Sequence, residues 1–287
     1  MATMAILALA IAAAGARTSH SSPPPPPVPL LAFNSTLGSN MVLQMAPSSS
    51  AVFGTVALNT NNVTITVTDG AGVTYSVAAV VNGGLWKALL RPAPAGGNYS
   101  ITAIANGTVT VTISSVAFGD VWYCGGQSNM ALPLLYTLSR NVSIAAIAKG
   151  KYANIRISQM SGNMNPTTPW MTVANATTAV DKEGVPLFMR FSATCYYFAE
   201  SLTDALGAAA PPLGLIHTAF GGSTIQQWLS NDTLNSGVCA NATSPQGGEG
   251  MWHDERVLPF SELSLKGWLW YQVCCPRPYG CPPRKIP

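Results

Sequence analysis

The chain has 287 residues, of which only 9% are charged, and its formal net charge is +3. Arg277, Arg284 and Lys285 equal that excess by themselves, so the rest of the chain is close to neutral. A neutral body argues against a nucleic-acid-binding surface. The length suffices for one large or two ordinary domains with sizeable cores.

Residues 1–16 form an apolar, alanine-rich run that ends in Ala14-Gly15-Ala16, a small-x-small cleavage pattern. This run is too short to cross a bilayer, and no later segment supplies a longer one, so we expect no membrane span. We interpret residues 1–16 as a secretory signal peptide, although the usual Lys or Arg near its start is missing. A disordered alanine-rich start is the alternative.

Glycosylation sequons also favour a secreted or lumenal protein, whether extracellular, vacuolar or lysosomal. The N-x-S/T pattern occurs at Asn34, Asn62, Asn98, Asn106, Asn141, Asn175, Asn231 and Asn241. Six cysteines permit disulfides in such a compartment. Only Cys124, Cys195 and Cys239 precede the last fourteen residues, and this odd number leaves their pairing open. No cysteine spacing suits a tetrahedral zinc site.

Composition and hydrophobic periodicity divide the chain after residue 16 into a linker and two domains. Residues 17–28 contain five consecutive prolines, Pro23 to Pro27, which favour an extended polyproline II spacer. Residues 29–116 alternate apolar residues with Thr or Ser in short runs separated by glycine turns, which predicts an antiparallel β-sandwich. That domain is interpreted as a scaffold, with a carbohydrate-binding module as the alternative.

From residue 117 to 273 strand-like pieces alternate with longer helical segments. Predicted strands cover 121–124, 155–159, 213–217 and 266–272, and predicted helices cover 142–149 and 191–206. This alternation predicts an α/β domain with a mainly parallel sheet and helices on both faces.

Two motifs in this second domain carry candidate chemistry. In Phe118–Met130, FGDVWYCGGQSNM, a strand ends in Gly125-Gly126 and Ser128 follows, which is how several hydrolase folds expose a nucleophilic hydroxyl. In Thr218–Trp228, Gly221 and Gly222 follow a strand and leave backbone N–H groups free to form an oxyanion hole. The alternatives are a Ser-Asn turn and an ordinary glycine turn.

These motifs resemble, in order, the blocks of the sialate O-acetylesterase family, carbohydrate esterases of the SGNH-hydrolase superfamily. Further matches are Met41-Val42-Leu43-Gln44 in the first domain, FSATCYYF from Phe191, and KGWLWYQ from Lys266 to Gln272. The resemblance implies an SGNH, flavodoxin-like fold that removes acetyl esters from sugars through an acetyl-enzyme on Ser128. Gln127, Asn129 and Gln272 would support the site, and no metal or organic cofactor is implied.

The sequence departs from the family pattern after Gln272. The family continues into G-E-x-N and later into D-x-x-H, whereas residues 274–287 are a Pro- and Cys-rich tail without either motif. We therefore expect an incomplete α/β domain with no base His and Asp. His20 lies in the linker, and His217 is interpreted as a core residue. His253 with Asp254 or Glu255 is a poor dyad, since neighbours on a helix do not face each other.

A serine without its base loses most of its rate. We expect this chain to be a weak or inactive carbohydrate O-acetylesterase. The alternatives are a secreted glycan-binding glycoprotein and a non-functional truncation product.

Overall fold

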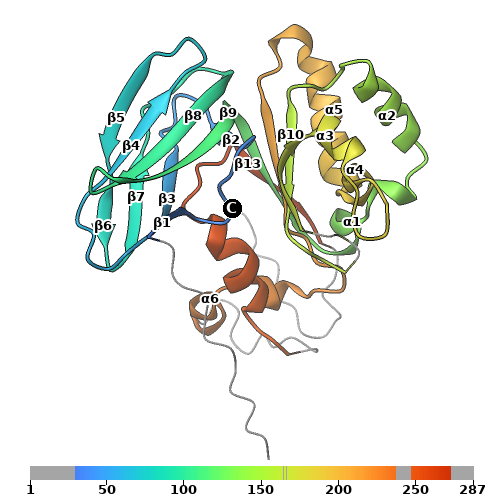
Figure 1. Ribbon diagram of the computed structural model, residues 1–287. Coiled ribbons are helices and arrows are strands. Elements are labelled where there is room, and N and C mark those ends of the chain that lie inside the picture. Colours follow the sequence, from blue (N-terminus) through green and yellow to red (C-terminus); the bar gives the residue numbers. More distant parts are fainter. Residues whose placement is uncertain (1–29, 164, 166, 237–246, 273–287) are drawn as a thin grey trace, which may run out of the picture.

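The computed structural model describes residues 30–163, 165, 167–236 and 247–272. The predicted signal peptide, the proline-rich linker and the tail at 274–287 lie outside the described residues, as does Cys239. Within the described part, strands predominate at the N-terminal end and strands and helices alternate afterwards (Figure 1). We refer to residues 30–116 as the antiparallel region and to residues 117–272 as the parallel region.

The antiparallel region is built from short strands in which apolar side chains alternate with Thr or Ser. Its strands are β1 (Leu31–Phe33), β2 (Val42–Gln44), β3 (Ala51–Val56), β4 (Val63–Thr68), β5 (Thr74–Ala78), β6 (Val80–Asn82), β7 (Leu85–Leu89) and β8 (Gly96–Ala105). Strands β1, β3, β7 and β6 form a separate four-stranded sheet. Trp86 of that sheet and Ile65 and Ile101 of β4 and β8 share one hydrophobic core, because a period of two turns the apolar residues to one face.

Strand β9 (Val109–Gly126) joins the two regions and crosses the predicted boundary at residue 116 without a break. Its first part pairs with β8 antiparallel, and its second part pairs with β12 (Leu213–His217) and β13 (Gly267–Tyr271) parallel. With β10 (Ile155–Gln159) and β11 (Thr168–Thr172) added, the order is β11-β10-β12-β9-β8-β4-β5. The result is one mixed sheet of nine strands, since β2 and β13 also pair with β9.

Helices cover one face of the parallel strands (Figure 1). They are α1 (Ser128–Ala131), α2 (Arg140–Ala148), α3 (Val173–Thr178), α4 (Leu187–Arg190) and α5 (Ala193–Leu206). Leu213 and Leu215 face this layer, and the aromatic residues Phe191 and Tyr196 are fully buried in it. The predicted helix over 191–206 begins at Ala193 in the structure, because Ser192 caps it by accepting a hydrogen bond from the Cys195 N–H.

The opposite face of the same strands is covered differently from the prediction of helices on both sides. Val121, Tyr123 and Ile216 join the core of the antiparallel region, together with Leu43 and Phe260. Phe260 ends a 3₁₀ turn (Leu258–Phe260) that follows a π-helix (His253–Val257). This face is therefore closed by the first region and by short helical turns, because β9 carries the same core from one region into the other.

A disulfide settles the pairing that the sequence left open. Cys124 near the end of β9 is bonded to Cys195 in α5, with their Cα atoms 6.0 Å apart and a separation of 71 positions in the chain. The bond fixes the C-terminal end of β9 to the helical layer. A short helix α6 (Asn231–Asn235) follows later, and none of the described helices is both long and apolar enough to cross a membrane.

Candidate active site at the carboxyl edge of the parallel strands

The turn after β9 is sterically possible only with glycine. Gly126 has a φ of +128°, and a Cβ on it would lie 2.3 Å from the Tyr271 carbonyl oxygen. A Cβ on Gly125 would lie 2.7 Å from the Trp270 ring. The close approach of β13 therefore explains the Gly-Gly pair, and the turn places Ser128 at the start of α1.

Ser128 is solvent-exposed, and no hydrogen bond within the described part of the chain engages its Oγ. Met130, two residues later, is buried against the helical layer and its N–H donates to the Gln127 carbonyl at 2.9 Å. The turn is thus anchored on both sides of an accessible hydroxyl, which is the placement expected of a nucleophile.

The loop after β12 runs directly beside this turn. The pairing of β12 with β9 continues past the strand end, because the Thr218 N–H donates to Cys124 O and the Phe220 N–H donates to Gly126 O, both at 3.0 Å. Gly221 follows the last of these bonds, and a Cβ on it would lie 3.9 Å from the Ser128 Cα. The backbones of residues that are 93 positions apart in the sequence therefore approach each other closely.

The two glycines of this loop differ in their surroundings. The Gly221 N–H donates to the Asn163 Oδ1 at 3.1 Å, whereas Gly222 is exposed with a φ of +83°. An amide carbonyl oxygen therefore sits on the Gly221 donor, in the way that the oxygen of a substrate carbonyl would bind. Asn163 was not predicted as a site residue, and no motif surrounds it in the sequence.

The supporting residues connect the turn to its neighbours. The Gln127 N–H donates to Tyr271 O at 3.0 Å, and the Gln272 Nε2 donates to Ser223 O at 2.9 Å. Asn129 is exposed, and its carbonyl accepts a hydrogen bond from the Thr194 hydroxyl at 2.9 Å. Strand β13 and helix α5 thus hold the turn and the glycine loop in their places, with Gln127 and Asn129 next to Ser128 along the chain.

The histidines do not supply a base for Ser128 in the described residues. His217 is fully buried with Nδ1 2.9 Å from Gln159 Oε1, and burial together with the Arg256 guanidinium lowers the pKa of His217 to about 3. The expected core position of His217 is confirmed. The prediction that His253 does not face Asp254 was wrong, because the His253 Nδ1 lies 2.8 Å from Asp254 Oδ1. The π-helix brings these neighbours together, yet no described contact links either to Ser128. His20 lies outside the described residues.

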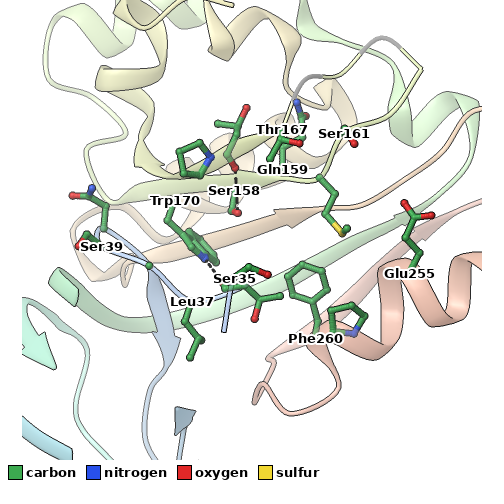
Figure 2. Close-up of a pocket in the computed structure, with 17 residues that line it drawn as sticks. Ser35, Leu37, Ser39, Ser158, Gln159, Ser161, Thr167, Trp170, Glu255 and Phe260 are labelled. Carbon is green, nitrogen blue, oxygen red and sulfur yellow. Dashed lines mark hydrogen bonds between the residues drawn. The ribbon is translucent and has the colours of Figure 1, made fainter. Parts of the chain in front are cut away.

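Two cavities lie near the loop that contains Asn163. One, of about 680 Å³, is bordered by Asn163 and by the charged residues Asp181, Lys182, Glu183 and Arg190. The other, of about 740 Å³, lies between the loop after β1, strands β10 and β11, and the helical turn that carries Glu255 and Phe260 (Figure 2). Its polar lining is mainly hydroxyl and amide groups. Ser161 borders both cavities.

Comparisons with known proteins show what the chain is similar to. No family model matches the chain. The sialate O-acetylesterases of Pongo abelii and Homo sapiens are each 29% identical to it over 264 residues, covering 84% of this chain and 48% of each relative. The chain is related to the sialate O-acetylesterases. It spans about half the length of these curated relatives.

A solved structure shows the shared fold. The crystal structure of a carbohydrate acetylesterase from Xanthomonas citri matches with a TM-score of 0.64 at 23% sequence identity, over 84% of this chain and 51% of that chain. The mixed sheets and this likeness fit an SGNH-like fold. Like the curated relatives, this neighbour extends well beyond the portion that it shares with the present chain.

Proposed function

We propose that the chain carries the nucleophile half of a carbohydrate O-acetylesterase site, acting on acetyl esters of sugars. The observation that carries the proposal is the juxtaposition of an exposed Ser128 with Gly221 in a relative of the sialate O-acetylesterases. The architecture we infer for it is an antiparallel β-sandwich (29–116) followed by part of an SGNH-type domain (117–273).

The proposed chemistry follows from the positions of the groups. The Ser128 Oγ attacks the acetyl carbonyl carbon, and its proton passes to a base. The N–H groups of Gly221 and Gly222 then stabilise the negative charge that develops on the carbonyl oxygen. The sugar hydroxyl leaves with a proton, and water hydrolyses the acetyl-serine to release acetate. For the Gly221 N–H to take part, the acetyl oxygen must replace the Asn163 Oδ1 on it.

The proton acceptor is the weak point of the proposed site. The D-x-x-H pattern of the resembled family does not occur in the 287 residues, and the described histidines lack contact with Ser128. Oxyanion donors without a base leave a residual rate advantage of about 10³–10⁴ over water, against losses of about 10⁶. We therefore propose that these residues turn over substrate weakly or not at all.

The proposed compartment is secreted or lumenal. The Cys124–Cys195 disulfide suits an oxidising environment. Of the sequon asparagines in the described part of the chain, all but the partly buried Asn34 are exposed, so glycan attachment is sterically open at Asn62, Asn98, Asn106, Asn141, Asn175 and Asn231.

The test labels the serine directly. The full chain, produced in a secretory host, is treated with a fluorophosphonate, whose fluoride is displaced when a serine oxygen bonds to phosphorus. We expect a single adduct that forms slowly, because Ser128 lacks a base, on the peptide that contains Ser128, and none in Ser128→Ala. Ser236→Ala, which changes an exposed serine at the end of α6, is the matched control and should label normally.

Acetate release is then measured with O-acetylated sialic acid and with acetylated cell-wall or storage polysaccharides, to compare these substrates. Labelling that persists in Ser128→Ala would contradict the proposal. Retention of an acetylated glycan without any labelling would instead support the binding-glycoprotein alternative.

A further inference from the structure

Arg256 is a buried cation that the proposed chemistry does not use. Its residue is only 2% exposed, in a chain with few charged residues. The nearest carboxylate belongs to Glu255, 3.3 Å from Nη2, but the Glu255 side chain is 52% exposed. A buried guanidinium without a buried carboxylate carries a desolvation penalty, so its retention calls for a reason.

The guanidinium donates to two backbone carbonyls. Nη1 donates to Thr218 O at 3.1 Å, and Nη2 donates to Ser161 O at 2.6 Å. Thr218 is the first residue after β12, and Ser161 lies two residues after β10. Arg256 therefore connects the starts of the two loops that leave the carboxyl edge of neighbouring parallel strands.

These loops meet again beside the nucleophile. Three residues after Thr218 stands Gly221, and two residues after Ser161 stands Asn163, and the two are joined by the 3.1 Å hydrogen bond described above. Arg256 thus joins the two loops where they leave their strands, and Gly221, further along one of them, lies close to Ser128. A shift of the Thr218 or Ser161 carbonyl would be transmitted over only a few backbone bonds to the Gly221 amide.

The guanidinium is itself held in a fixed orientation. Its central carbon lies 5.1 Å from the Phe220 ring centre and 4.8 Å from that of Trp252, and these rings stack 4.2 Å apart. The Arg256 carbonyl accepts a hydrogen bond from the buried Tyr123 hydroxyl at 2.9 Å. Phe220 immediately precedes Gly221, so the stacking acts on the same loop. The planar fork of arginine reaches two carbonyls at once, which a lysine ammonium on a flexible stem does less rigidly.

We infer that Arg256 is a positioning residue for the oxyanion site, fixing the loops of Gly221 and Asn163 relative to Ser128 through its two carbonyl contacts. The effect of Arg256 on catalysis rests on the proposed function, in which Ser128 reacts with the substrate. The structural part of the inference, the fixing of the two loops, is independent of whether Ser128 reacts.

The experiment compares Arg256→Met and Arg256→Lys with Arg156→Met. Arg156 is the matched control, because it also donates to two backbone carbonyls, those of Met41 and Ser115, but these lie in the antiparallel region. The rate constant of fluorophosphonate labelling at saturation and the concentration for half-saturation are measured on the full chain. Hydrogen exchange by mass spectrometry follows the peptides that contain 161–163 and 218–224.

We expect Arg256→Met to slow labelling at saturation about 10- to 100-fold, as misplacement by about 1 Å does, with little change in the half-saturating concentration. Exchange in both loops should accelerate, Arg256→Lys should be intermediate, and Arg156→Met should resemble the wild type. Unchanged exchange and labelling in a folded Arg256→Met would overturn the inference. If that variant does not fold, Arg256→Lys with wild-type labelling and exchange would do so.

The two proposals fail in different ways. A wild-type chain that never labels on Ser128 contradicts the esterase proposal, while the exchange comparison still decides whether Arg256 fixes the loops. Equal acceleration of both loops in Arg156→Met would show a general loss of rigidity and would also overturn the inference.

Discussion

The two halves of β9 show how differently one strand can be used. From Val109 to Ser114 its residues alternate between exposed and at least partly buried positions, with Thr110 and Thr112 turned to solvent. From Val116 to Gly126 every residue is buried except the partly buried Trp122. The first half belongs to an antiparallel sheet that has one solvent-exposed face. The second half lies between β12 and β13, and both of its faces are covered.

The distribution of buried polar residues follows the same division. In the described antiparallel region, only Gln44, Ser50 and Thr60 are buried polar residues, and none is charged. The parallel region buries the titratable residues Asp120, His217 and Arg256, together with many hydroxyl and amide side chains. Because buried polar groups need partners, this region carries more hydrogen-bond constraints than its fold alone requires. The difference marks the region where positions must be fixed for chemistry.

The largest effect should come from the disulfide that ties the second half of β9 to α5. In Cys124→Ala/Cys195→Ala, the loss of a cross-link across 71 residues should lower the free energy of unfolding by about 4 kcal/mol in the chain-entropy view. Urea unfolding measures the change. Wild-type protein under reducing conditions should match the variant, and a variant as stable as the oxidised wild type would contradict the prediction.

A slightly smaller loss of the free energy of unfolding is expected for a substitution at the point where β9 passes from the antiparallel to the parallel region. A Cβ on Gly119 would lie 1.9 Å from the Pro212 carbonyl oxygen, so Gly119→Ala should displace the chain before β12 and destabilise by about 3 kcal/mol. Gly96→Ala, with open space around the added carbon, is the control and should be close to neutral. Thermal unfolding by circular dichroism compares them, and equal melting temperatures would show that the junction is not tight.

The buried histidine should make stability depend on pH. The pKa of His217 is lowered to about 3 in the folded chain from about 6.5 in the unfolded chain, so the unfolded state binds the proton more readily. Stability from this group is present above pH 6.5 and is lost as the pH falls toward 3, at about 1.4 kcal/mol per pH unit. His217→Gln should remove this pH dependence. Between pH 7 and pH 5 the variant should therefore lose about 2 kcal/mol less of its free energy of unfolding than the wild type does.

The measurement for His217→Gln is urea unfolding of the variant and the wild type at pH 7, 6 and 5. Parallel stability profiles of the variant and the wild type would mean that His217 is protonated equally in both states.

The smallest losses of stability are expected on removal of single hydroxyl groups, and a buried hydroxyl should cost more than an exposed one. The Ser192 Oγ donates to Met130 O at 2.6 Å and accepts from the Cys195 N–H at 3.1 Å, fully buried, so Ser192→Ala should destabilise by about 1–2 kcal/mol. Thr102, paired with Thr112 on the outer face of β8 and β9, should lose only about 0.5 kcal/mol in Thr102→Ala. Chemical denaturation measures both, and equal losses would remove the distinction between the two regions.

The sequence by itself determined the local features. The predicted strand at 155–159 is β10, the helix predicted at 142–149 lies over α2, and the glycine pair before Ser128 forms the turn that its composition requires. Such features depend on neighbours in the chain, because side-chain periodicity and the freedom of glycine act within a few residues.

Only the tertiary structure decided which distant groups meet. Nothing near Asn163 or Arg256 in the sequence indicates that one receives the Gly221 N–H and the other holds both loops. The pairing of Cys124 with Cys195 and the covering of the second sheet face by the first region were equally hidden. These contacts follow from the parallel order of β10, β12 and β9, which brings the ends of three strands to one edge whatever their separation along the chain.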